Sequence, residues 1–178
     1  MSTNQPHNRS AHSFFEKFCS PATMMEAEEE LLVEGVNAIP LLAELLEGTA
    51  RNVHGVPYRA LGLPLRCAVE VSGRLGPAAK PLERLLLDEL ARGYVPAAMA
   101  LGRLGTLEER SVRALASCLE SSDADIVAEV AVALINCGRI AHPAVVRITG
   151  SSKRAAIHVL QMQHYLARQN FIASLPAP

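Results

Sequence analysis

The residue types that most often carry out chemistry are represented here by four cysteines and six histidines. No two cysteines form C-x-x-C, and no two histidines form H-x-x-x-H or H-E-x-x-H, the spacings that bring zinc ligands together. A nucleophile and base formed by Cys19 and His12 would lie in a polar leader, where no rigid scaffold holds the two groups within reach. We therefore expect no catalytic residue, no metal and no cofactor.

Three of the cysteines indicate a protein from a reducing compartment. Cys67, Cys118 and Cys137 stand inside apolar helical stretches, which is typical of core cysteines in a protein that is kept reduced. The first residues lack the basic and apolar regions of a secretory signal peptide. No apolar run reaches the roughly 18 residues that a membrane span needs. The sequence therefore predicts a cytoplasmic protein without membrane contact.

Acidic side chains form two groups, one a possible cation site and one a possible contact surface, and both fit helix starts better. Asp123 and Asp125 form a D-x-D sequence, yet Ser121-Ser122 precede them and an apolar helical run follows. Capping and interaction with the helix dipole explain both aspartates. The glutamates at 26 and 28–30 are interpreted in the same way as a solvated first turn, with an acidic contact surface as the alternative.

The charge balance argues against a nucleic-acid partner. The formal net charge is −1, from 17 Lys and Arg against 18 Asp and Glu, so no overall field attracts phosphates. Aromatic residues make up 4% of the chain, so side chains on which bases could stack are scarce. Arginines on the helices predicted below are offset by acids on the same helices: Arg84, Arg113 and Arg147 against Glu83, Asp88 and Glu120.

The elements that position these residues are expected to be helices in a repeating order. The pattern G-x-x-A-x-P starts at Gly35, Gly76 and Gly138, and residues 101–105 echo residues 72–76. A glycine after an apolar segment can take the left-handed conformation that ends a helix, and proline is tolerated in the first turn of the next. The pattern therefore predicts hairpins whose first helices end at Gly35, Gly76, Gly105 and Gly138, and whose second helices begin at Pro40, Pro81 and Pro143.

With these motifs the chain resembles HEAT repeats, in particular the compact bacterial HEAT-like type first described in phycobilisome lyases, over about residues 28–168. The resemblance implies an all-α fold, a short right-handed α-solenoid of about four helical hairpins. Ser151-Ser152 would cap a last helix that runs through Ile157, Leu160 and Leu166 and caps the array. Residues 1–21 are expected to form a flexible leader with a short amphipathic piece, which docks on the first hairpin or on a partner. Residues 22–178 are expected to form a single HEAT-like domain.

The resemblance is specific for the fold but not for the function, because the family includes scaffolds, adaptors, inhibitors, chromophore lyases and DNA-repair proteins. Without a catalytic constellation, the sequence favours a non-enzymatic protein-binding module, such as an adaptor, a regulator or a toxin-neutralising immunity protein. One alternative is a chromophore lyase or chaperone, for which no residue can be carried over. The other is a structural subunit of a larger complex.

The predicted partner surface follows the second helices, on polar positions that turn away from the leucine stripes and line a concave face. It consists of Glu44, Glu47, Arg84, Asp88, Arg113, Ser117 and Arg147. A merely solvated face is the alternative. Residues 49–63 are predicted to form an insertion loop, either a mobile connector or a second contact site that includes Tyr58 and Arg59.

Overall fold

The computed structural model describes residues 14–174, and every regular element in that range is helical. Residues 14–17 form a short helical turn, and no strand occurs among the described residues. The prediction of an all-α fold is confirmed. The α-helices are α2 (Met24–Glu34), α3 (Ile39–Glu47), α4 (Gly62–Leu75), α5 (Glu83–Ala91), α6 (Pro96–Arg103), α7 (Glu109–Cys118), α8 (Ala124–Asn136), α9 (Pro143–Ser151) and α10 (Lys153–Ala173). The 3₁₀ helices are η1 (Gly35–Ala38), η2 (Tyr58–Ala60) and η3 (Gly76–Leu82).

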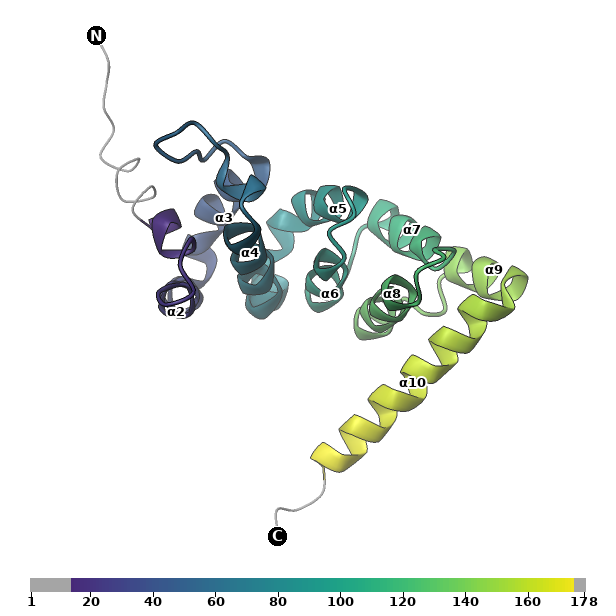
Figure 1. Ribbon diagram of the computed structural model, residues 1–178. Helices are drawn as coiled ribbons and strands as arrows, with labels where there is room; N and C mark the ends of the chain where they lie inside the picture. The colour runs from purple at the N-terminus through teal and green to yellow at the C-terminus, as the bar shows by residue number, and fades with distance from the viewer. Residues whose placement is uncertain (1–13, 175–178) are drawn as a thin grey trace.

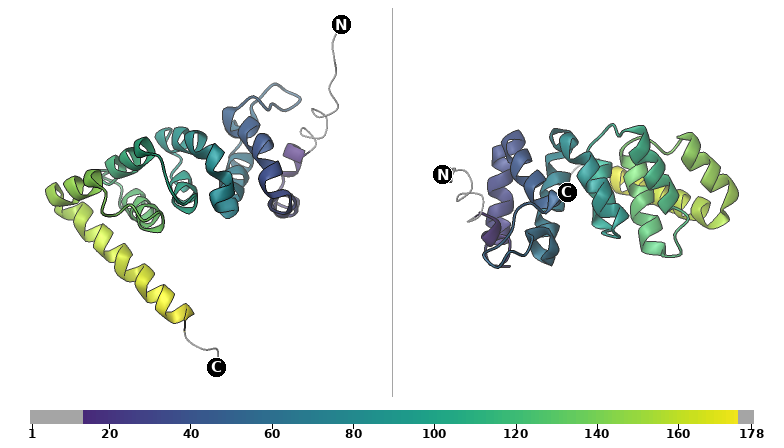
Figure 2. Two further views of the ribbon diagram at one scale, coloured as in Figure 1. Left: turned by 180° about the vertical axis from the view of Figure 1, so that it is seen from behind. Right: turned by 90° about the horizontal axis from the view of Figure 1, so that it is seen from above.

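The helices are arranged in two layers that advance together along the chain (Figure 1). In one layer α2, α4, α6 and α8 pack each on the next, and in the other α3, α5, α7 and α9 do the same. Contacts between the layers join α3 to α4, α5 to α6, and α7 to α8. Helix α10 packs on α8 and α9 and then runs back beneath the first layer, as the views in Figure 2 also show.

The four glycines predicted to end first helices all have positive φ, at Gly35, Gly76, Gly105 and Gly138. Glycine adopts this conformation without the steric cost that a Cβ would add. The prolines at the starts of α3 and α9 lie in the first turn, as predicted, where a missing N–H removes no intrahelical bond.

The second hairpin departs from this pattern, because Pro81 does not begin its helix. Pro81 lies inside η3, and α5 begins two residues later at Glu83. Both Pro77 and Pro81 lack the N–H that an α-helical bond to residue i−4 requires. The segment therefore keeps the tighter 3₁₀ geometry until Glu83, and the predicted start at Pro81 is wrong by two residues.

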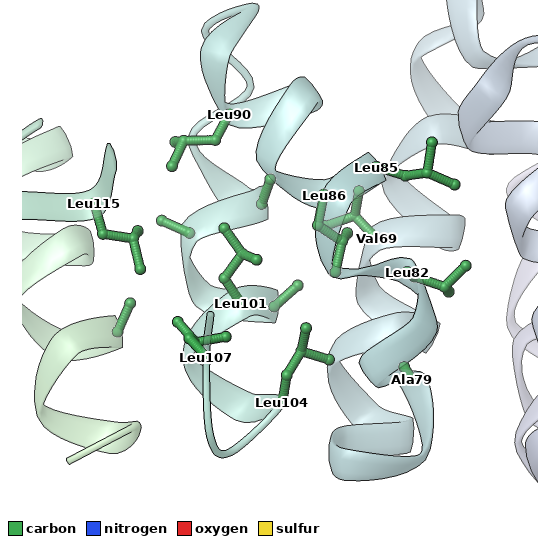
Figure 3. Close-up of a cluster of buried hydrophobic side chains, with 14 of the residues drawn as sticks. Val69, Ala79, Leu82, Leu85, Leu86, Leu90, Leu101, Leu104, Leu107 and Leu115 are labelled. Carbon is green, nitrogen blue, oxygen red and sulfur yellow. The ribbon is translucent and has the colours of Figure 1, made fainter. Parts of the chain in front are cut away.

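Buried leucines fill the space between the two layers (Figure 3). They come from η3, α5, α6 and α7 and the turns between them, so the core continues from one helix pair to the next. Full burial of one such side chain contributes roughly 1.5–3 kcal/mol. The labelled leucines are Leu82, Leu85, Leu86, Leu90, Leu101, Leu104, Leu107 and Leu115, and Val69 of α4 and Ala79 of η3 are labelled beside them.

Two glycines allow the helices of the first layer to approach closely. A Cβ built on Gly73 of α4 would lie 3.2 Å from the Cα of Ala100 in α6. One built on Gly102 of α6 would lie 2.6 Å from the Cα of Ala133 in α8. Gly73 and Gly102 hold the same place in the echoed segments, so the same close contact recurs at successive steps of the layer.

The amphipathic piece of the leader is part of the fold. Phe15 and Phe18 are fully buried, and the Phe15 ring packs on Tyr58 with centroids 5.2 Å apart. Lys17 forms an ion pair with Glu30 of α2 at 2.7 Å. Of the predicted flexible leader, residues 14–21 are therefore structured, while residues 1–13 lie outside the described part of the chain.

Candidate interaction surfaces

The residues predicted to bind a partner on the second helices lie in one layer, on α3, α5, α7 and α9. Asp88 is half-buried and the other six are exposed. The structure brings three of them together, because the Arg84 guanidinium lies 3.1 Å from the Asp88 carboxylate and 3.9 Å from that of Glu47. Opposite charges thus neutralise one another within this surface, and a partner would have to compete with these ion pairs.

A further polar cluster on this layer includes a histidine that the sequence analysis left without a role. Arg113 lies 2.8 Å from the Glu109 carboxylate, whose other oxygen lies 2.9 Å from Nε2 of His142. His142 is also the N-cap of α9, since its Nδ1 accepts the backbone N–H of Ala144. In the neutral ring, Nε2 therefore carries the proton and donates it to Glu109. The hydrogen bonds from His142 and Arg113 hold the pKa of Glu109 below its usual value.

The insertion loop is shorter and better anchored than predicted, running from the end of α3 to the start of α4 at Gly62. Tyr58 is 0% exposed, and its hydroxyl donates a 2.6 Å hydrogen bond to Glu16. Burial, followed by this hydrogen bond, raises the pKa of Tyr58 well above its usual value. Tyr58 therefore belongs to the core and does not present a surface to a partner, so its assignment as a contact residue is corrected.

Arg59, the second residue proposed for this loop, also has an internal role. Its guanidinium lies 3.4 Å from the carboxylate of Glu89, which is buried at the end of α5. It also donates a 3.4 Å hydrogen bond to the carbonyl oxygen of Leu46 in α3. The side chain thus joins two helices of the second layer and balances a buried charge, which explains its position without a partner.

A recess of ≈ 190 Å³ lies on the first layer, whereas the sequence prediction placed a concave surface on the second helices. Glu70 of α4 and Arg103 of α6 form an ion pair across it at 3.6 Å. One carboxylate oxygen of Glu129 is buried without a hydrogen-bond partner, and burial followed by the charge of Asp125 raises its pKa. The lining residues are Arg66, Val69, Glu70, Gly73, Pro96, Met99, Ala100, Arg103 and Glu129.

Helix α10 begins as predicted and then leaves the array. The Ser152 side chain accepts the N–H of Ala155, so the predicted cap is present. Only the first half of the helix packs closely, through Ala155 and Val159. Ile157 and Leu160, through which the capping helix was expected to run, are exposed. The other large apolar side chains of α10 that are exposed are Tyr165, Phe171 and Ile172.

Cysteines and other potential ligands do not converge within residues 14–174, where no three His, Cys, Asp or Glu side chains are placed to hold a metal ion. Cys19, Cys67, Cys118 and Cys137 are all free thiols. Burial, followed by a hydrogen bond with Glu28, raises the pKa of Cys67 to about 12, which makes this thiol a poor nucleophile. In the same part of the chain, no helix combines the length and apolarity needed to span a bilayer.

Comparison with known proteins assigns no family to this chain. No protein-family model matches it, and no curated protein or solved structure gives a significant match. The resemblance to HEAT-like repeats therefore stays an interpretation of the glycine and proline pattern.

Proposed function

We propose that this protein is a non-enzymatic protein-binding module, an α-solenoid of HEAT-like hairpins that contacts its partner through α10. The observation that carries the proposal is the exposure of five large apolar side chains on this single helix, among them Phe171 at 65% and Tyr165 at 53%. Soluble proteins seldom expose such a group of residues unless it binds something.

The arrangement of helices supports the solenoid part of the proposal. Each helix of a layer packs on the corresponding helix of the neighbouring pair, and the close contacts of Gly73 and Gly102 recur at successive steps. A stack in which each unit contacts only its neighbours is the defining property of repeat proteins.

Two surfaces compete for the partner, and their chemistry favours α10. Interface centres are enriched in aromatic and other apolar side chains and depleted in charge. α10 supplies Tyr165 and Phe171, whereas the second-layer surface has charges that are already paired, such as Arg84 with Asp88. Burial of those pairs would cost desolvation without providing an apolar anchor.

The proposal is tested by affinity capture from the native host with two matched variants. In the first, Tyr165→Ser, Phe171→Ser and Ile172→Ser remove the apolar surface of α10. In the second, Arg84→Glu, Arg113→Glu and Arg147→Glu change the second layer, and circular dichroism checks that both variants fold. We expect the α10 variant to lose the captured protein and the arginine variant to keep it. The reverse result moves the site to the second helices, and capture unaffected by either variant overturns both assignments.

A further inference from the structure

We propose that the partner of α10 includes a second copy of this chain, with α10 of one copy docked on α2 of the next, head to tail. This inference rests on the proposed function, because it takes α10 as a binding surface. It adds which surface α10 binds and the chemistry of that surface.

The exposed side of α10 is a stripe of basic and apolar residues. Its members follow one another at intervals of three or four positions, the spacing that places residues on one face of a helix. This face is opposite to the one that packs on the array through Ala155 and Val159. The helix contains no Asp or Glu. The stripe consists of Lys153, Ile157, Leu160, His164, Arg168 and Phe171, all of which are exposed.

The exposed side of α2 has the opposite charge and a similar apolar content. This helix contains five glutamates and no basic residue. Glu26 and Glu29 are exposed beside Met25, and one turn beyond Glu29 is Val33, a residue that is 88% exposed. Val36, in the turn that follows, continues the apolar part of this surface. These residues form the α2 stripe: Met25, Glu26, Glu29, Val33 and Val36.

Charge decides between the ways in which two copies could meet. Two α10 helices placed side by side would bring the positive charges of Lys153 and Arg168 close to those of the other copy, and the like charges would repel. Two α2 helices would in the same way bring glutamates together. Pairing α10 with α2 instead places ammonium and guanidinium groups opposite carboxylates, and valines opposite Ile157 and Leu160. Glu29 already forms an ion pair with Arg74 of its own chain at 2.7 Å, so Glu26 is the acid we assign to the contact with α10.

The places of the two helices in the fold determine the form of the assembly. α2 begins the array and α10 follows its last helix pair, so the two stripes lie on different parts of the molecule (Figure 1). A contact between two different surfaces leaves one of each free at the ends of a dimer. Further copies can therefore add at either end, until the assembly closes into a ring or the protein concentration limits its length.

The experiment uses the full chain with two charge-reversed variants, followed by sedimentation velocity across a range of concentrations. The α10 variant combines Lys153→Glu and Arg168→Glu, and the α2 variant combines Glu26→Lys and Glu29→Lys. Wild type should form species that grow with concentration and dissociate at high salt. Each variant alone should be monomeric, with association weakened at least about tenfold. An equimolar mixture should again form species that grow with concentration, because the reversed α10 of one variant meets the reversed α2 of the other, and the two unchanged surfaces also match.

Two controls and three contrary outcomes make the test decisive. Circular dichroism establishes that the variants are folded, and Arg113→Glu with Arg147→Glu, on the other layer, should leave association unchanged. An α2 variant that still self-associates would show α10 pairing with α10 and overturn the proposal. So would a mixture of variants that stays monomeric, or a wild type that is monomeric at every concentration. A monomeric wild type that still captures a host protein through α10 leaves the proposed function standing.

Discussion

Glu83 is a carboxylate buried where α5 meets the first turn of α7, with only 2% of the residue exposed. It forms an ion pair with Lys80 and accepts the backbone N–H of Glu108, the N-cap residue of α7, at 2.8 Å. Burial alone would raise its pKa, but the Lys80 ammonium and the hydrogen bond from the Glu108 N–H help to outweigh burial and hold the pKa below its usual value. The charge therefore joins η3 and α5 to the first turn of α7.

Glu83→Gln is expected to lower the free energy of unfolding by about 2 kcal/mol at neutral pH, because a charged acceptor is replaced by a neutral one at a buried site. The pKa of Glu83 is lower in the folded chain than in the unfolded one, so its contribution is complete above the ordinary carboxyl pKa. The contribution is lost as the pH falls through the folded-state pKa. Urea unfolding of both proteins from pH 7 downward should show their difference shrinking in acid. A difference that stays constant, or one matched by the exposed control Glu120→Gln, would contradict this role.

At the scale of elements, the spacing of the first-layer helices depends on residues without side chains. Gly102→Ala would place a methyl group 2.6 Å from the Cα of Ala133, so α6 and α8 must move apart. We expect a loss of about 1–3 kcal/mol in unfolding free energy. Gly150→Ala, in α9, is the matched control because no atom lies within 4 Å of its added Cβ. That change should stabilise the helix by about 0.5–1 kcal/mol. Equal effects of the two changes on the melting temperature would show that Gly102 is not a packing residue.

The loop between α3 and α4 offers a second test at this scale. Arg51 is exposed near the loop tip, whereas Arg59 is half-buried between Leu46 and Glu89. Trypsin needs an accessible, locally mobile segment. Limited digestion followed by mass spectrometry should therefore find cleavage after Arg51 well before cleavage after Arg59. Early cleavage after Arg59 would mean that its contacts with α3 and α5 do not anchor the loop.

The sequence predicts helix existence and helix ends well, because a single glycine or proline acts on the backbone of its immediate neighbours. It predicts the surroundings of single residues poorly. From the local sequence, Tyr58 is assigned to a loop. In the structure its ring packs on Phe15, which lies 43 positions earlier in the chain (58 − 15 = 43). The close contact of Gly102 depends on Ala133, so its role as a spacer is not visible in the local sequence. The direction of α10 likewise depends on packing against α8 and α9, which a one-dimensional pattern does not specify.

At the scale of the whole molecule, stability is expected to reside in the two layers and not in the end of α10. Removal of residues 163–178 should change the free energy of unfolding by no more than about 0.5 kcal/mol, since the described residues of this segment are mostly exposed. Val159→Ala, on the packed half of the helix, should cost about 2 kcal/mol. Urea unfolding measures both, at concentrations low enough to avoid self-association. A large loss on truncation would mean that the end of α10 supports the array.

The packing of each helix on the next pair along the chain also determines how the molecule responds to force. Within residues 14–174, the main contacts between helices join elements that follow one another closely along the chain, and none of these contacts links the first helices to the last. Tension applied between the ends would therefore peel helices away one or two at a time, each step releasing a short length of chain at a modest load. For the same reason folding requires closure of short loops only, which favours rapid folding.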